Sequence, residues 1–148
     1  MGKGMQIGVL AILLAGVVIG ARAEVVVQQP WLRAVPPVSP TMAGYMVLVN
    51  RGRQAVRLTG ARSEVAGQVV MHRVVMEKDG SSHMQALGTV TLAPGERLIF
   101  APGGRHLMLM DMSRVPPLGS RVPVCLQFRK RAPLCQPFLV RQQAPVSH

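Results

Sequence analysis

Aromatic and acidic residues are scarce in this chain of 148 residues. Tryptophan, tyrosine and phenylalanine together make up only 3% of it, and six acidic side chains stand against 17 basic ones. We find no paired carboxylates and no nucleophile–base arrangement, so the sequence does not predict an enzyme. Because 49% of the residues are hydrophobic, the chain can still form one domain with a core of Val, Leu, Ala and Met.

A hydrophobic run of about 20 residues, which a comfortable membrane span needs, is also missing. The apolar stretch at residues 7–19 has the length of the hydrophobic region of a secretory signal peptide, and Lys3 precedes it. Ala21-Arg22-Ala23 then forms an A-x-A cleavage site, with no Cys after it that could carry a lipid. We therefore expect residues 1–23 to be a cleaved signal peptide, with an uncleaved anchor as the alternative, and no stable membrane insertion after cleavage.

Only two cysteines are present, Cys125 and Cys135, and they do not form a C-x-x-C motif. They lie in two strand-like runs, residues 122–128 and 134–140, which a basic turn joins. A hairpin centred on Lys130 places the two side chains opposite each other, and an exported protein meets oxidising conditions. We predict a Cys125–Cys135 disulfide; a thiol pair that binds copper or exchanges disulfides is the alternative.

The basic charge is large, at +11 for the whole chain and +9 once Lys3 and Arg22 leave with the signal peptide. Nucleic-acid binding is not predicted, because the chain is exported, its arginines are scattered and no aromatic platform accompanies them. We interpret the charge as a solvated surface. Attraction to anionic lipid headgroups or to an acidic partner is the functional alternative.

Glycine and proline, with 15 and 12 residues, punctuate the chain as turns between short apolar runs. About nine short strands and no amphipathic helix follow from this pattern, which is typical of an all-β sandwich or barrel. Residues 142–148 are expected to be a flexible C-terminal tail. The predicted strands are residues 25–35, 43–50, 55–61, 68–76, 83–87, 97–100, 105–111, 122–128 and 134–140.

Four side chains form the candidate metal site: His72, Met84, His106 and Met108. Imidazole with thioether is a donor set that selects Cu(I), whereas Zn²⁺ and Mg²⁺ favour other ligands. His106 and Met108 are two residues apart in a strand, so both leave the same face. We interpret Met110 and Met112 as core residues. A blue-copper site is not predicted, because neither Cys has a His and a Met close by in sequence.

These residues resemble the periplasmic copper-A chaperone (PCuAC) family over nearly all of residues 25–140. The segments that carry the resemblance are Trp31-Leu32-Arg33-Ala34, Met71-His72, Leu92-Ala93-Pro94-Gly95 and residues 102–110. The family motif is His-x10-Met-x21-His-x-Met. Here 21 residues separate Met84 from His106, as the motif requires, but 11 separate His72 from Met84. The extra residue lies in the polar turn 77–82, so Met76 and His83 are kept as substitute ligands.

The resemblance implies a cupredoxin-like Greek-key β-sandwich, at residues 24–141, in the periplasm. It further implies a monomeric Cu(I) chaperone that delivers copper to the copper-A subunit of a respiratory oxidase, with a thiol-based copper assembly factor as a second partner. Two alternatives remain open. One is a copper buffer or tolerance protein without a dedicated recipient, and the other is an exported β-sandwich interaction module.

The spacing also makes a geometric prediction for residues 76–84. A hairpin centred on residues 79–80 sets Val75 or Met76 opposite Met84, and leaves His72 about four residues, or ~13 Å, away along the strand. If His72 and Met84 bind one ion, this segment must therefore curl back as an irregular loop.

Overall fold

The computed structural model describes residues 2 and 24–146, and the predicted signal peptide lies almost wholly outside these described residues. Ten strands and no helix form the described part, which confirms the all-β prediction. The strand that the sequence did not indicate is β6, which has only three residues. The strands are β1 (Val25–Arg33), β2 (Met42–Asn50), β3 (Val56–Arg62), β4 (Ala66–Met76), β5 (Ser82–Ala86), β6 (Val90–Leu92), β7 (Arg97–Phe100), β8 (Arg105–Met112), β9 (Arg121–Phe128) and β10 (Arg131–Arg141).

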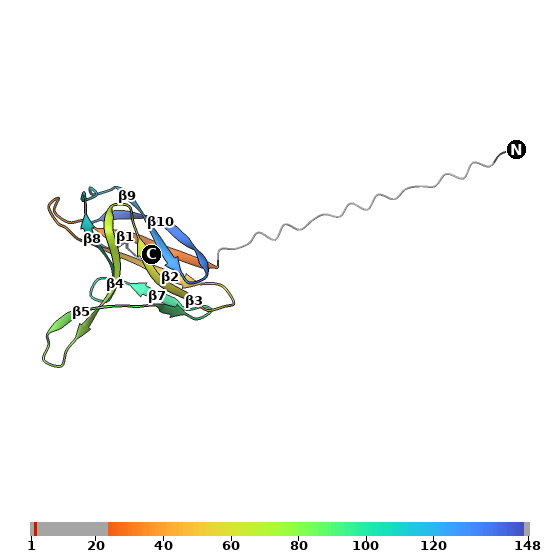
Figure 1. Cartoon of the computed structure of the whole chain (residues 1–148), viewed down its shortest axis with the longest axis horizontal. Coiled ribbons are helices and arrows are strands. Elements are labelled where there is room, and N and C mark those ends of the chain that lie inside the picture. Colours follow the sequence, from red (N-terminus) through yellow and green to blue (C-terminus); the bar gives the residue numbers. More distant parts are fainter. Residues whose placement is uncertain (1, 3–23, 147–148) are drawn as a thin grey trace.

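The strands form one sheet that closes on itself (Figure 1). Hydrogen-bonded neighbours run in the order β4-β8-β2-β1-β10-β9-β3, and a further pairing of β3 with β4 returns to the start. β5 extends the sheet beyond β4, while β6 lies beside β3 and β7 beside β2. This is a barrel-like sandwich, in which closure leaves few free strand edges. Within the described residues, no helix is long and apolar enough to span a membrane.

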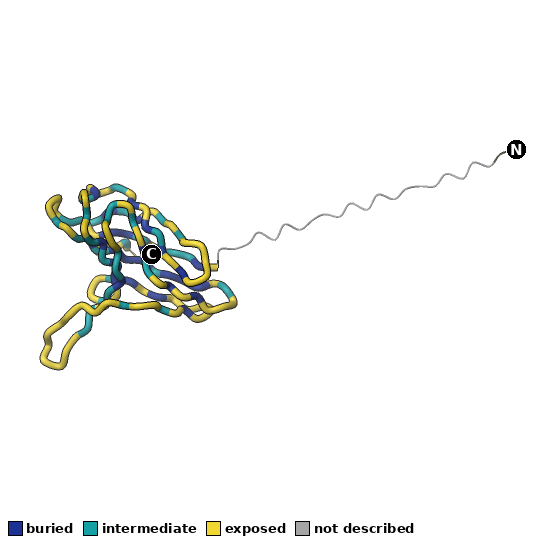
Figure 2. The backbone as a smooth tube through the Cα atoms, viewed as in Figure 1, coloured by how far each residue is buried: buried dark blue, intermediate teal, exposed yellow. Residues whose placement is uncertain are grey.

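The core fills the inside of this closed sheet, where the buried residues of Figure 2 gather. Alternate residues of β7 and β9 point inward, which explains the apolar–polar alternation of these two strands. The largest fully buried side chains include Phe138, Leu32, Leu48 and Leu107. Because the chain has few aromatic residues, aliphatic side chains make up most of this core.

The hairpin of β9 and β10 contains a disulfide between Cys125 and Cys135. The two residues are direct partners in the antiparallel register, which is the opposition that the turn at Lys130 indicated. Both cysteines of the chain are used in this bond. The hairpin also carries buried core residues on both strands, including Val124 and Phe138.

The hairpin of β4 and β5 projects from the body, and every residue of β5 is exposed (Figures 1 and 2). Its ladder is regular from His72↔Ala86 to Met76↔Ser82, so the predicted irregular loop is wrong. The turn is centred on Asp79, and Met84 therefore pairs with Val74. The physical reason lies in the turn, where the Glu77 N–H donates to the Ser81 carbonyl at 2.8 Å and the Asp79 carboxylate accepts from Ser81.

Candidate metal centre

The two predicted histidines face each other across neighbouring strands. His72 on β4 and His106 on β8 are direct register partners, and their ring centroids are 5.6 Å apart at an interplanar angle of 62°. Their neighbours Met71 and Leu107 point into the core, so the imidazoles lie on the outer face of the sheet. Two residues that are 34 positions apart in the chain thus form one pair of nitrogen donors.

His106 is held in one orientation by the backbone. Its Nδ1 lies 3.3 Å from the carbonyl oxygen of Gly104, which can only accept a hydrogen bond. In the neutral ring this contact places the proton on Nδ1 and leaves the lone pair on Nε2. His106 is only 5% exposed, and its Nε2 is buried without a hydrogen-bond partner. A buried ring nitrogen in this state is prepared to bind a metal ion.

His72 presents a second such atom. Its Nδ1 is buried and has no hydrogen-bond partner, although the side chain as a whole is half-buried. Burial lowers the pKa of His72 below its ordinary value, and the neighbouring His106 lowers this pKa further. The imidazole is therefore neutral near pH 7, which is the form that coordinates metal. Leaving a buried polar atom unsatisfied costs about 1–3 kcal/mol, and a bound ion would remove that cost.

Met108 lies on the same face of β8 as His106, as the sequence predicted. It pairs with Val70 and is half-buried. It does not belong to the hydrophobic core cluster, nor to the residues packed against that cluster. Its thioether is therefore available beside the histidine pair.

Met84 lies on the solvent side of the same region. It is paired with Val74, which is two residues beyond His72 and on the same face of β4. Diagonal neighbours of this kind are ~7–8 Å apart, within reach of a long side chain. Met84 is 59% exposed. The hairpin register thus makes Met84 a diagonal neighbour of His72. Its strand partner is two residues from His72, whereas the sequence predicted a partner about four residues away.

The two substitute ligands are placed less favourably. Met76 lies on the same face of β4 as His72 but four residues farther along the strand, where it pairs with Ser82. Its side chain is 67% exposed. His83 pairs with Val75 and so points to the opposite face of the hairpin. Its Nδ1 lies 3.1 Å from a carboxylate oxygen of Glu77. The structure therefore brings neither residue to the histidine pair.

Two features of this region were missed in the sequence. Met110, expected in the core, is half-buried on the outer face next to Met108 and lies outside the core cluster, whereas Met112 packs against the core. Asp111 between them has a φ of 53°, which changes the direction of the strand. The role of the Gly104 carbonyl was also missed. The Pro102-Gly103-Gly104 turn, directly before His106, was the signal that could have indicated it.

The donor set fits a soft monovalent ion better than a hard divalent one. No group of three or more His, Cys, Asp or Glu residues that could hold a metal is present among residues 24–146. Two imidazoles and nearby thioethers, without a carboxylate or thiolate, are the ligands expected for Cu(I).

A family model and a curated protein both match most of this chain. The family model described as "Putative lipoprotein LpqE-like" matches residues 25–139. The curated relative "Putative lipoprotein Lxx21020" from Leifsonia xyli subsp. xyli is 28% identical over 110 residues, which are 74% of this chain. The chain spans 65% of the length of that relative.

Solved structures share the fold. The copper-bound PCuAC domain from PmoF2 is 28% identical, with a TM-score of 0.67 over 84% of this chain and 97% of that domain. The solution structure of Cu(I)-bound DR1885 from Deinococcus radiodurans is 27% identical, with a TM-score of 0.65 over 83% of this chain and 82% of its own. The predicted resemblance to PCuAC domains and the cupredoxin-like fold are both confirmed.

Proposed function

Because this chain belongs to the LpqE-like family, which is of the PCuAC type, we propose that it is an exported carrier of Cu(I). One observation carries the proposal. His72 and His106 pair across β4 and β8, and each has a buried ring nitrogen without a hydrogen-bond partner. The copper-bound state of the PmoF2 domain and the Cu(I)-bound state of DR1885 support the same ion as cargo.

In this proposal His72 binds through Nδ1 and His106 through Nε2, because these are the nitrogens that the structure leaves without a partner. Met108 supplies a thioether from the same strand face as His106, and Met84 supplies one from the exposed hairpin. All four donors are uncharged when both imidazoles are neutral, so the complex keeps the single charge of the ion. Neutral donors without a thiolate give moderate affinity, which suits a protein that must release its ion.

The exposure of Met84 gives the site a side from which a recipient can approach. A donor from the recipient can replace this thioether first, while the more buried His106 still holds the ion. Transfer would then proceed by stepwise ligand exchange. The hairpin that carries Met84 has no buried residue in β5, so it can move without disturbing the core.

The finer proposal concerns the recipient. We propose that the chain works in the periplasm and delivers copper to the copper-A subunit of a respiratory oxidase, beside a thiol-based assembly factor. The support is the resemblance to copper-A chaperones and the lipoprotein names of the relatives, which indicate export. A deletion strain tests this: loss of oxidase activity at low copper supports delivery, and copper sensitivity alone supports a buffer.

The binding proposal is tested by anaerobic Cu(I) competition titration of the chain from Glu24 onwards, with a copper-edge X-ray absorption spectrum to count nitrogen and sulfur neighbours. The double variant His72→Ala/His106→Ala should lose Cu(I) binding. His83→Ala is the matched control, because His83 lies on the same hairpin but on its other face. Equal loss in both variants, or unchanged binding in the double variant, would contradict the proposed site.

A further inference from the structure

A basic pocket lies away from the proposed copper site. It has a volume of about 530 Å³ and lies between the start of β3, with the two residues before it, and the turn that joins β9 to β10. Four of the seven lining residues are cationic, and none is acidic. The lining residues are Gln54, Ala55, Val56, Arg57, Arg129, Lys130 and Arg131. None of them belongs to the candidate metal centre.

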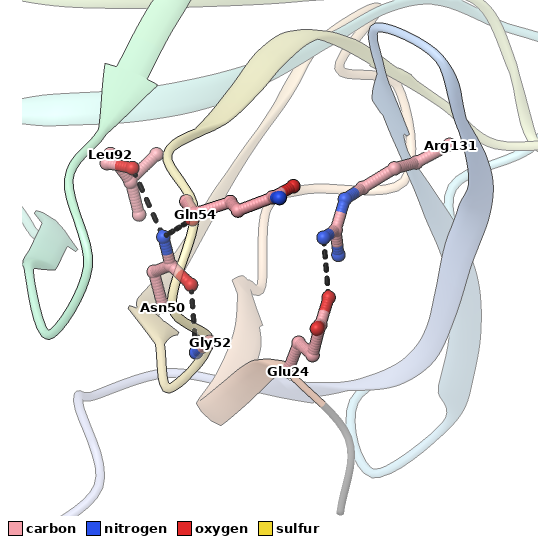
Figure 3. Close-up of polar contacts among 6 residues, drawn as sticks. All are labelled: Glu24, Asn50, Gly52, Gln54, Leu92 and Arg131. Atoms are coloured by element: carbon pink, nitrogen blue, oxygen red, sulfur yellow. Dashed lines mark hydrogen bonds and ion pairs between the residues drawn. The ribbon is translucent and has the colours of Figure 1, made fainter. Parts of the chain in front are cut away.

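One wall of the pocket is fixed by a buried side chain. Asn50 is fully buried, and its amide donates to the carbonyls of Gln54 and Leu92 at 2.8 and 3.1 Å (Figure 3). Its side-chain oxygen accepts from the Gly52 N–H at 3.0 Å. These contacts hold the segment that places Gln54 and Arg57 at the pocket. This wall is therefore preorganised rather than a loose surface loop.

The other wall is the β9–β10 turn, which is fixed in three ways. The Arg129 N–H donates to the Arg57 carbonyl at 3.0 Å and so joins the two walls. Lys130 has a φ of 56°, as a tight turn requires. The Cys125–Cys135 disulfide crosslinks the two strands behind the turn. Three consecutive basic residues are thus presented by one rigid hairpin.

The charge at this pocket is only partly compensated. Arg131 pairs with the Glu24 carboxylate, which comes from outside the pocket lining (Figure 3). Arg57, Arg129 and Lys130 form no salt bridge with an acidic side chain of residues 24–146. The cationic side chains around this pocket repel one another, and an anion bound in the pocket would reduce that repulsion. Guanidinium groups are well suited to oxyanions, because they donate two parallel hydrogen bonds.

We propose that this basic pocket binds a phosphate-type oxyanion, taken either from free phosphate or from the headgroup of an anionic lipid. Glu24, at the N-terminal end of the folded body, contacts Arg131 at this same pocket. The β4–β5 hairpin, which carries two of the four proposed copper ligands, projects from a different side of the body (Figure 1). An anion or a membrane surface at the pocket would therefore leave the copper site accessible.

The test uses the chain from Glu24 onwards, whose described residues contain the complete closed sheet. Inorganic phosphate is titrated at constant ionic strength while backbone amide NMR shifts are followed. In parallel, sedimentation is measured with phosphatidylglycerol vesicles and with phosphatidylcholine vesicles. Saturable shifts at Arg57 and residues 129–131 are expected, and Arg57→Gln/Arg129→Gln should weaken binding by about tenfold, as the loss of two solvent-exposed charge contacts implies.

Arg62→Gln/Arg121→Gln is the matched control, because it removes the same charge from exposed strand positions outside the pocket lining. It should change binding by less than about twofold if the pocket, rather than net charge, binds the anion. Phosphate binding assigns the free anion as the source, and binding to phosphatidylglycerol vesicles alone assigns the lipid headgroup. No binding in either arm, or equal weakening in both double variants, overturns the proposal.

An unchanged far-UV circular dichroism spectrum shows that each variant is folded, so this test does not depend on the copper proposal. If Arg57→Gln/Arg129→Gln does not fold, Lys130→Gln replaces it, because this side chain is exposed at the turn. Weaker phosphate or vesicle binding by about threefold is then expected, and unchanged binding overturns the proposal.

Discussion

Two hairpins of this protein have similar local structure but different surroundings. The β9–β10 hairpin forms part of the closed sheet, is crosslinked by a disulfide and buries Val122, Val124, Leu126 and Phe138. The β4–β5 hairpin extends beyond the body, and β5 buries no residue at all. The contrast indicates that stability is concentrated in one hairpin, while the other is free to present a metal ligand.

The sharpest test of this contrast is Phe138→Ala, because Phe138 is fully buried in the core. We expect a loss of about 3–5 kcal/mol in the free energy of unfolding, the range for a deleted buried aromatic side chain. Met84→Ala on the other hairpin should change it by less than about 0.5 kcal/mol, as surface positions do. Urea unfolding followed by circular dichroism measures both. Similar losses in the two variants would show that stability is not divided between the hairpins in this way.

The disulfide should account for a smaller part of the stability. Cys125→Ser/Cys135→Ser is expected to lower the free energy of unfolding by about 2–3 kcal/mol, because the bond closes a short loop in the unfolded chain. The Cu(I) affinity of this double variant should stay unchanged, since the sulfurs are not proposed ligands. Urea unfolding and Cu(I) competition titration provide the two readouts. A parallel fall in copper affinity would favour the thiol-based alternative.

His106→Ala should weaken Cu(I) binding more than Met108→Ala. Imidazole is the stronger donor, and His106 is already oriented by the Gly104 carbonyl. We expect the histidine variant to lose at least about 100-fold in affinity, above the range seen when only a supporting contact is lost. Competition titrations with the two variants decide the order. A larger loss for Met108→Ala would reverse the assigned roles.

Met84→Leu is expected to have a smaller effect, of about tenfold or less in affinity, because its thioether is the most exposed of the four proposed donors. Met76→Leu is the control, since Met76 lies on the same face but farther from His72. Cu(I) titration of both variants measures this difference. A loss confined to Met76→Leu would make Met76 the ligand.

The smallest effect concerns pH. Burial and, to a lesser extent, His106 lower the pKa of His72 below its ordinary value of 6.5, so the neutral form of this imidazole already predominates at that pH. The contribution of His72 to stability should therefore be complete above pH 6.5 and be lost as pH falls from 6.5 towards the lowered pKa. Cu(I) affinity should fall as pH drops through the lowered pKa, where protons compete for the buried nitrogen. The unfolded chain binds this proton more tightly than the folded state, so acid destabilises the fold between these two pKa values, and the group adds no further loss below the lower one. Titrations between pH 5.5 and 8 check this, with His72→Ala expected to flatten the stability profile.

Several features followed from local sequence patterns. The period of two along residues 105–111 placed His106 and Met108 on one face, and the Lys130 turn set Cys125 opposite Cys135. Both depend on short-range geometry. A second hairpin turn was mispredicted: the centre of the β4–β5 turn was placed half a residue to one residue too far along the chain, which moved the predicted partner of Met84 from Val74 to Val75 or Met76. In a hairpin, register depends on hydrogen bonds inside the turn that composition does not reveal.

By itself, the sequence determined the chemistry of the donors, the scarcity of competing carboxylates and the alternation that separates core from surface. These are properties of residue types and of their neighbours along the strand. Only the tertiary structure decided that His72 meets His106, that Gly104 fixes the free nitrogen, and that four cations gather around one pocket. The reason is that strand pairing joins residues far apart in the chain, and its register is set by the packing of the whole sheet.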